Sequence, residues 1–190
     1  MVPSGLDLVV AGALLADLRT ANLVSVHRDR VRGIAGQPTG DVDLDEVHDR
    51  IRSRWPTRRV GRWLRDIASR HPAQRRVHAL LRSGVLAEYE SQAEEDHPAA
   101  RRVFLPERAG EDLVLDEPRS GLRGGPVDGR TLLLLTVLRA AGLHRVWFPD
   151  IPPAEVEGRL DALVAGSWLW PPLHAATAGF PDDGWARSLP

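Results

Sequence analysis

One helix-length segment near the start of the chain constrains the fold more than any other. Residues 6–18, LDLVVAGALLADL, are apolar at nearly every position, so their apolar side chains do not gather on one side. A helix of this kind is stable only when neighbours cover it all round, which places it inside a bundle. Ser4 stands where it can cap the first turn. The segment predicts a helical bundle around a central apolar helix. With the chain length and the strand signals described next, we expect a mainly α, single-domain fold with one or two short β-hairpins.

Periodicity and end signals predict the elements that follow. The segment LVSVHRDRVRGIAG (23–36) alternates weakly and ends in glycine, which favours a short pair of strands. Three helices are expected next: one capped by Asp41 or Asp43 and running to about Arg54, one with Pro56 in its first turn, and one from Pro72 to a terminating Gly84. The residues expected to face inward are Val60, Trp63, Leu64 and Ile67 in the second helix, and Val77, Leu80 and Leu81 in the third.

The second half of the chain predicts one hairpin and further helices. Residues 85–106 read as a hairpin with a long acidic loop, and residues 120–129 as a loop. Asp128 is expected to cap a strongly apolar helix over 130–141, with Gly142 after it, and another helix is expected over about 153–164. We expect one domain over residues 1–180 and a loose C-terminal tail over 181–190.

Composition and motif searches exclude several classes of function. Cysteine is absent, which excludes disulfides, thiolate catalysis and cysteine-based zinc sites. Nucleotide-binding, hydrolase and metalloprotease motifs are also absent, so the expectation is a protein that is not an enzyme and needs no cofactor or metal. His71 and His78 lack a third ligand nearby in the sequence and are read as helix-surface or capping residues. No segment resembles a signal peptide or a membrane span, which predicts a cytoplasmic protein, or one peripheral on the inner face of a membrane.

Charge is unevenly distributed although the net charge is only −1. Every basic residue is an arginine, whose planar fork suits phosphate or carboxylate. From Arg50 to Ser83 there are eleven arginines and one acid, Asp66, whereas Glu88 to Glu117 holds ten acids and three arginines. Two interpretations stay open: solvated faces that partly neutralise each other within the fold or between subunits, or a site for a polyanion such as a phosphoinositide headgroup, an anionic membrane or a nucleic acid.

Five motifs follow one another along the chain: AGALLADL (11–18), PTGDVDLDEVHDRI (38–51), the Trp63-Leu64 pair, LLRSGVL (80–86) and DGRTLLLLTVLRAAGL (128–143). In this order they resemble the Golgi phosphoprotein 3 family, in a bacterial-type form. The resemblance covers about residues 8–165. It implies a mostly helical domain with a β-hairpin that inserts into membranes or mediates oligomers, and a basic pocket that binds phosphatidylinositol 4-phosphate.

The pocket residues of the family are matched only in part. Arg70 occupies one pocket position, whereas Ala11 and Ala73 stand where the family has arginines, and no aromatic residue occupies the position of its tryptophan. Arg75 and Arg76 lie one turn further along and are expected to substitute. The resemblance thus implies headgroup binding by Arg70, and we expect Arg75 and Arg76 to contact the phosphate as well. The charge distribution adds a supporting basic patch of Arg58, Arg59, Arg62 and Arg65.

These observations favour a peripheral protein that binds anionic phospholipid headgroups or a membrane surface. The alternative is a helical protein–protein adaptor or oligomeric scaffold without lipid specificity, with a homo-oligomer formed through the 86–106 hairpin. Nucleic acid is not an expected partner, because the basic helices offer neither aromatic stacking nor a groove-reading motif.

Overall fold

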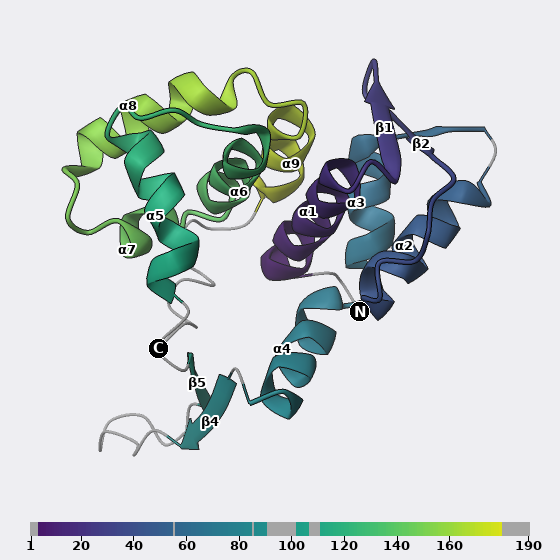
Figure 1. Cartoon of the computed structure of the whole chain (residues 1–190), viewed down its shortest axis with the longest axis horizontal. Coiled ribbons are helices and arrows are strands. Elements are labelled where there is room, and N and C mark those ends of the chain that lie inside the picture. The colour runs from purple at the N-terminus through teal and green to yellow at the C-terminus, as the bar shows by residue number, and fades with distance from the viewer. Residues whose placement is uncertain (1–3, 55, 85, 91–101, 107–110, 180–190) are drawn as a thin grey trace.

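The computed structural model describes residues 4–54, 56–84, 86–90, 102–106 and 111–179, which form nine helices and two small antiparallel sheets (Figure 1). The helices are α1 Gly5–Thr20, α2 Val42–Arg52, α3 Val60–Ala68, α4 Pro72–Arg82, α5 Glu111–Leu122, α6 Gly129–Ala140, α7 His144–Trp147, α8 Pro153–Val164 and α9 Trp170–Thr177. The strands are β1 Val24–His27, β2 Arg30–Gly33, β3 Arg58–Arg59, β4 Leu86–Glu90 and β5 Arg102–Pro106. The expected mainly α fold with short hairpins is confirmed. The expected tail at 181–190 lies outside the described residues.

The all-round apolar helix lies at the centre of the bundle, as predicted. α1 packs against α2, α3, α4, α6 and α9, and Figure 1 shows it between α3 and the α6–α9 pair. Ser4 caps it, because its hydroxyl accepts the N–H of Asp7 while the Asp7 carboxylate accepts the N–H of Ser4 at 3.0 Å. This reciprocal arrangement satisfies two free donors at the start of the helix.

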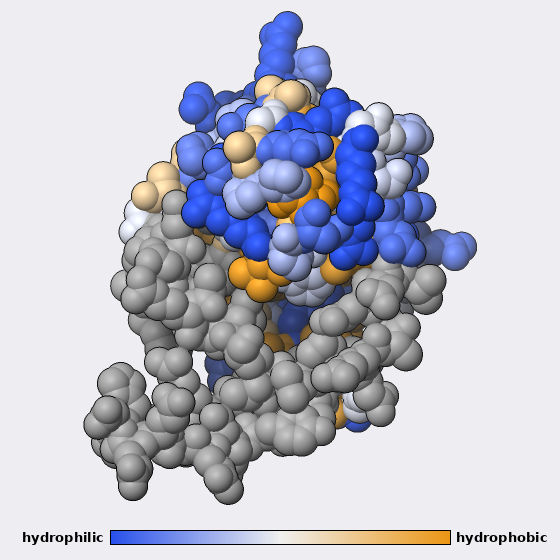
Figure 2. Space-filling model, turned by 90° about the vertical axis from the view of Figure 1, so that its left-hand side faces the viewer, coloured by the Kyte–Doolittle hydropathy of each residue, from blue (hydrophilic) through white to orange (hydrophobic). Residues whose placement is uncertain are grey.

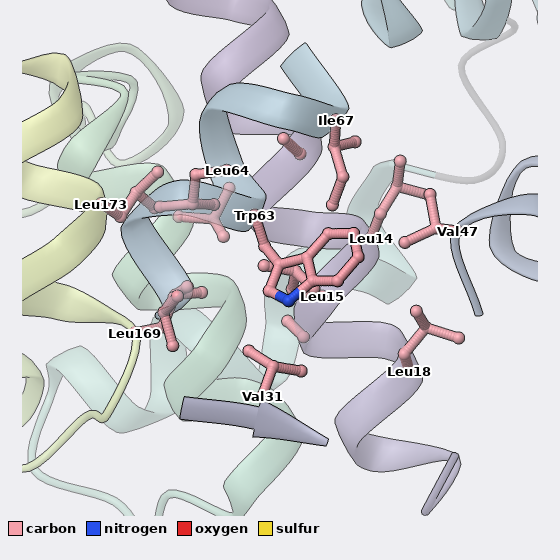
Figure 3. Packing of buried hydrophobic residues seen from close by; sticks show 14 of the residues in the cluster. Leu14, Leu15, Leu18, Val31, Val47, Trp63, Leu64, Ile67, Leu169 and Leu173 are labelled. Atoms are coloured by element: carbon pink, nitrogen blue, oxygen red, sulfur yellow. The ribbon is translucent and has the colours of Figure 1, made fainter. Parts of the chain in front are cut away.

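The main core surrounds Trp63 (Figure 3), which is 1% exposed and comes from α3. Around the indole lie side chains from other elements, among them Leu15 of α1, Val31 of β2 and Leu169 just before α9. Because these elements are far apart in the sequence, the indole holds the strands, α1 and α9 in one body. The predicted inward face of α3 is confirmed, since Val60, Trp63, Leu64 and Ile67 are all buried.

A second cluster lies among α5, α6, α7 and α8, and α6 belongs to both cores. Leu133 and Val137 face the first core, while Leu135 and Leu138 face the second. This explains why the segment 130–141 is apolar on every side. Asp128 caps α6, as expected, by accepting the N–H of Thr131 at 2.7 Å.

Some predicted elements need correction. Pro56 does not start a helix, because residues 58–59 form β3 on the edge of β2 and α3 begins only at Val60. Leu80 does not face inward but is 37% exposed, and the buried residues of α4 lie at its start, Pro72 and Ala73. The expected loop over 120–129 overlaps the end of α5, a helix that was not predicted; α7 and α9 were not predicted either.

The predicted strand pairs are confirmed, and one of them has uncommon residues in its turn. β1 pairs with β2 up to His27 and Arg30, so Arg28 and Asp29 form the two-residue turn, with φ of 46° and 63°. Both residues thus adopt left-handed backbone conformations that glycine or asparagine would adopt more easily. β4 pairs with β5 from Leu86 and Pro106 to Glu90 and Arg102, and the loop of that hairpin lies outside the described residues.

Candidate anion-binding surface

The three arginines expected to hold a headgroup lie together, and each contacts a carboxylate of α2. Arg70, between α3 and α4, lies 3.4 Å from Glu46. Arg75 contacts Glu46 at 2.9 Å and Asp43 at 3.1 Å. Arg76 donates two hydrogen bonds to Asp41, at 2.6 and 2.9 Å, and also lies 3.3 Å from Asp43. A phosphate bound to these guanidinium groups must compete with carboxylates of the same chain.

The stretch PTGDVDLDE places those carboxylates by local hydrogen bonding. Asp41 is the N-cap of α2 and accepts the N–H groups of Asp43 and Leu44, each at 3.0 Å. Burial raises the pKa of Asp41, but the hydrogen bonds from Arg76 and Leu44 outweigh burial, so that its pKa lies below the ordinary value. Asp41 therefore stays ionised while it holds both the start of α2 and the side chain of Arg76.

A second carboxylate occupies the start of α4. Asp7 is only 4% exposed; besides the two groups of Ser4, it accepts the N–H of Ala73 at 3.2 Å and lies 3.2 Å from Nδ1 of His71. A helix N-terminus attracts anions because its N–H groups lack partners within the helix. Here Asp7 already supplies the anion, next to Ala73.

The four arginines of the predicted supporting patch have a different environment. Arg58 and Arg59 come from β3, and Arg62 and Arg65 from the first two turns of α3. None of them forms an ion pair with a carboxylate among the described residues, whereas Arg50, on α2, pairs with Asp66 of α3. The acids of α2 thus neutralise the side of the basic segment that faces α4 and leave the β3–α3 side charged.

This charged side lines an open pocket of about 740 Å³. Arg30 and Arg54, which were not part of the predicted patch, line it as well, so that six arginines surround it. Asp29, at the hairpin turn, is the one acid among its described lining residues. Pro172, Ala175 and Ala176 of α9 form an uncharged wall.

Backbone pairing and packing hold the pocket in shape. Arg30 pairs with Arg59 in the β2–β3 register and donates from its guanidinium to the carbonyl of Thr57 at 2.7 Å. Val60 donates its N–H to the carbonyl of Asp29 at 2.9 Å, which ties the hairpin turn to α3. The guanidinium carbon of Arg58 lies 5.8 Å from the centre of the Trp63 ring. The main core thus packs directly against the pocket through Trp63 and Val60.

Among the described residues, no three His, Cys, Asp or Glu side chains are grouped to hold a metal ion. No described helix is long and apolar enough to cross a membrane. The face over α5, α7 and α8 is mainly hydrophilic with apolar residues between (Figure 2).

The order of motifs, the central helix and the hairpin now agree with a comparison of whole sequences. The family model described as Golgi phosphoprotein 3 matches residues 2–178. The chain belongs to the Golgi phosphoprotein 3 family. No curated protein is significantly similar to it in sequence. This member of the Golgi phosphoprotein 3 family thus has two sets of arginines. Those near α4 pair with carboxylates, and those of β3 and α3 line an open pocket.

Sequence reasoning missed Arg30 because its place in the pocket depends on β3. The charge count began at Arg50 and therefore included Arg54 but not the hairpin. The weak alternation over 23–36 indicated strands, but a two-residue third strand that brings Arg30 beside Arg59 leaves almost no local signal.

Proposed function

We propose that this chain is a peripheral, non-enzymatic protein that binds anionic phospholipid headgroups at a membrane surface. The observation that carries the proposal is the group of arginines at β3 and α3 without carboxylate partners among the described residues. Membership in the Golgi phosphoprotein 3 family is consistent with it. Each arginine close to an anionic surface contributes about 1 kcal/mol of attraction, so this patch alone gives useful membrane affinity.

A finer proposal concerns Arg70, Arg75 and Arg76. The resemblance implies that they recognise phosphatidylinositol 4-phosphate, and their clustering beside α2 is compatible with a shared phosphate. A charge-assisted hydrogen bond to a phosphate contributes about 1.5–3 kcal/mol, comparable to one with a carboxylate. Because the phosphate only replaces Glu46, Asp43 and Asp41, the net gain is small, and we propose that the β3–α3 patch dominates attachment.

Vesicle flotation of the full chain tests both the general proposal of anionic-lipid binding and the finer proposal of phosphoinositide recognition. Neutral vesicles, vesicles with phosphatidylserine and vesicles with phosphatidylinositol 4-phosphate at matched charge are compared at moderate salt. We expect binding to both anionic kinds, and at least about 30-fold weaker binding for Arg62→Glu/Arg65→Glu, because the loss of two arginines removes about 2 kcal/mol of attraction and the two glutamates add repulsion. A preference for the phosphoinositide that Arg70→Glu abolishes would support the finer proposal.

The control variant is Arg130→Glu/Arg145→Glu, which changes the charge equally at two exposed sites outside the pocket. If the control and patch variants lose equal affinity for anionic vesicles, the effect comes from the net charge of the chain and not from the position of the arginines. Absence of binding to every anionic vesicle would refute the lipid proposal and favour the alternative, an adaptor or scaffold. Sedimentation then tests whether the chain forms a homo-oligomer through residues 86–106. It compares the full chain with a variant altered within that hairpin.

A further inference from the structure

The six arginines that line the pocket form a charge cluster that the chain itself does not neutralise within its described residues. Asp29 is the one acid among the described lining residues, so the lining carries a formal charge of +5. The chain has 26 acids, and α2 shows that it can place carboxylates against arginines where needed. Like charges held together by a folded backbone repel one another unless a counter-anion binds between them.

The pocket also has the size and wall chemistry of a ligand site. Its volume of about 740 Å³ falls within the range of small-molecule pockets, roughly 300–1,000 Å³. One wall is uncharged and is formed by a proline and two alanines of α9. Such a wall suits the uncharged part of a ligand that carries the anionic groups. Arginine forks bind phosphate oxygens in pairs, so several of them around one volume favour more than one phosphate.

Part of the arginine set is preorganised. The side chain of Arg30 is held by its hydrogen bond to the carbonyl of Thr57, and that of Arg58 lies over the ring of the buried Trp63. Side chains held in this way lose less conformational entropy when a ligand binds. The left-handed backbone of Arg28 and Asp29 places the hairpin turn at the rim of the same pocket, a strained conformation of the kind found at binding sites.

We propose that this arginine pocket is a discrete binding site for a compact anion that carries two or more phosphate groups. The phosphates can belong to a lipid headgroup or to a free oligophosphate. The proposal concerns the same arginine patch as the proposed function, but it requires one saturable site and not a diffuse attraction to a surface.

Isothermal titration of the full chain with tripolyphosphate, without divalent cations, tests the site. We expect saturable binding of one ligand per chain, and at least about 100-fold weaker binding for Arg59→Gln/Arg62→Gln, because two phosphate contacts are lost. Arg130→Gln/Arg145→Gln should bind as the unmodified chain does. Sulfate, with a single anionic centre, should bind at least about tenfold more weakly than tripolyphosphate.

Thermal unfolding without ligand shows whether each variant is folded, and the single variant Arg62→Gln, at an exposed position, replaces the double one if that is unstable. Saturating ligand, at about 100 times its Kd, should raise the Tm of the unmodified chain by roughly 5–10 °C. Absence of binding, or equal binding to the pocket and control variants, would overturn the proposal even if vesicles bind.

Flotation in the presence of saturating tripolyphosphate separates the two sources of phosphate. Release from anionic vesicles, beyond the effect of sodium chloride at equal ionic strength, assigns the pocket to a lipid headgroup. Retention on the vesicles, with one tripolyphosphate still bound, assigns it to a free oligophosphate. If tripolyphosphate binds and no vesicle does, the pocket stands and the proposed membrane function fails.

Discussion

Asp7 joins the first helix to the fourth through one buried carboxylate. It accepts hydrogen bonds from Ser4 on its own helix and from Ala73 at the start of α4, and it lies beside His71. His71 itself has φ of 52°, a left-handed conformation that is uncommon for a residue with a side chain. The Asp7 carboxylate thus fixes a strained turn between α3 and α4.

Asp7→Asn should destabilise the protein by about 2–4 kcal/mol. The substitution removes charge-assisted bonds and turns an NH₂ group toward backbone donors. Burial raises the pKa of Asp7, but hydrogen bonds from Ser4, His71 and Ala73 outweigh burial and lower the folded pKa below 3.8. The stabilisation is therefore complete above pH 3.8 and is lost as the pH falls through the lower folded value. Urea unfolding at several pH values measures it; an Asn variant with the same stability and the same acid sensitivity would contradict this role.

Two helical glycines show how packing decides the effect of one methyl group. A Cβ on Gly158 of α8 meets no described atom within 4 Å, whereas a Cβ on Gly12 of α1 lies 3.0 Å from the side chain of Leu173, which is fully buried. Gly158→Ala should stabilise by about 0.5–1 kcal/mol through helix propensity. Gly12→Ala should instead destabilise by about 1 kcal/mol, because overpacking exceeds the same gain. The denaturant midpoints of unfolding of the two variants test this prediction. If both substitutions stabilise the protein, α1 and α9 can move apart to accommodate the extra methyl group.

The acids of α2 and the arginines near α4 form one electrostatic unit. Glu46→Gln leaves Arg70 without its carboxylate partner, while Arg75 keeps Asp43. We therefore expect the affinity for anionic vesicles to rise by about fivefold, at about 1 kcal/mol for one released arginine. Asp49→Asn, an exposed acid on the same helix, is the matched control. No increase in flotation with Glu46→Gln would mean that Arg70 does not face the membrane.

Elements with strong local signals could be predicted from the sequence, and elements fixed by distant contacts could not. The cap at Asp128, the central helix and the strand pairs follow from neighbouring residues. α5 contains Pro118 and mixed charges, and α9 has two prolines in its first turn, so both resemble loops. The pairing of Arg76 with Asp41 joins residues 35 positions apart, which no local pattern shows. For this reason the arginine cluster was foreseeable, but its division into neutralised and charged parts was not.

The molecule as a whole is nearly neutral, with a net charge of −1, yet its charge is separated into distinct surfaces. Attachment through exposed arginines should therefore depend strongly on salt. Raising the ionic strength from about 0.1 M to about 1 M shortens the Debye length from about 10 Å to about 3 Å. We expect binding to anionic vesicles to fall to the level of neutral ones, with unchanged circular dichroism. Binding that resists salt would point to apolar insertion instead.

The central position of α1 has a consequence for synthesis on the ribosome. The partners that complete its surroundings, α6 and α9, come more than a hundred residues later in the chain. At about 5–20 residues per second, α9 leaves the ribosome on the order of 10–30 s after α1. During that time the most apolar helix of the protein has no complete core to enter. The helix that defines the folded state is thus also the segment most in need of protection, by a chaperone or by early contacts with α2 and α3, while the chain is still being made.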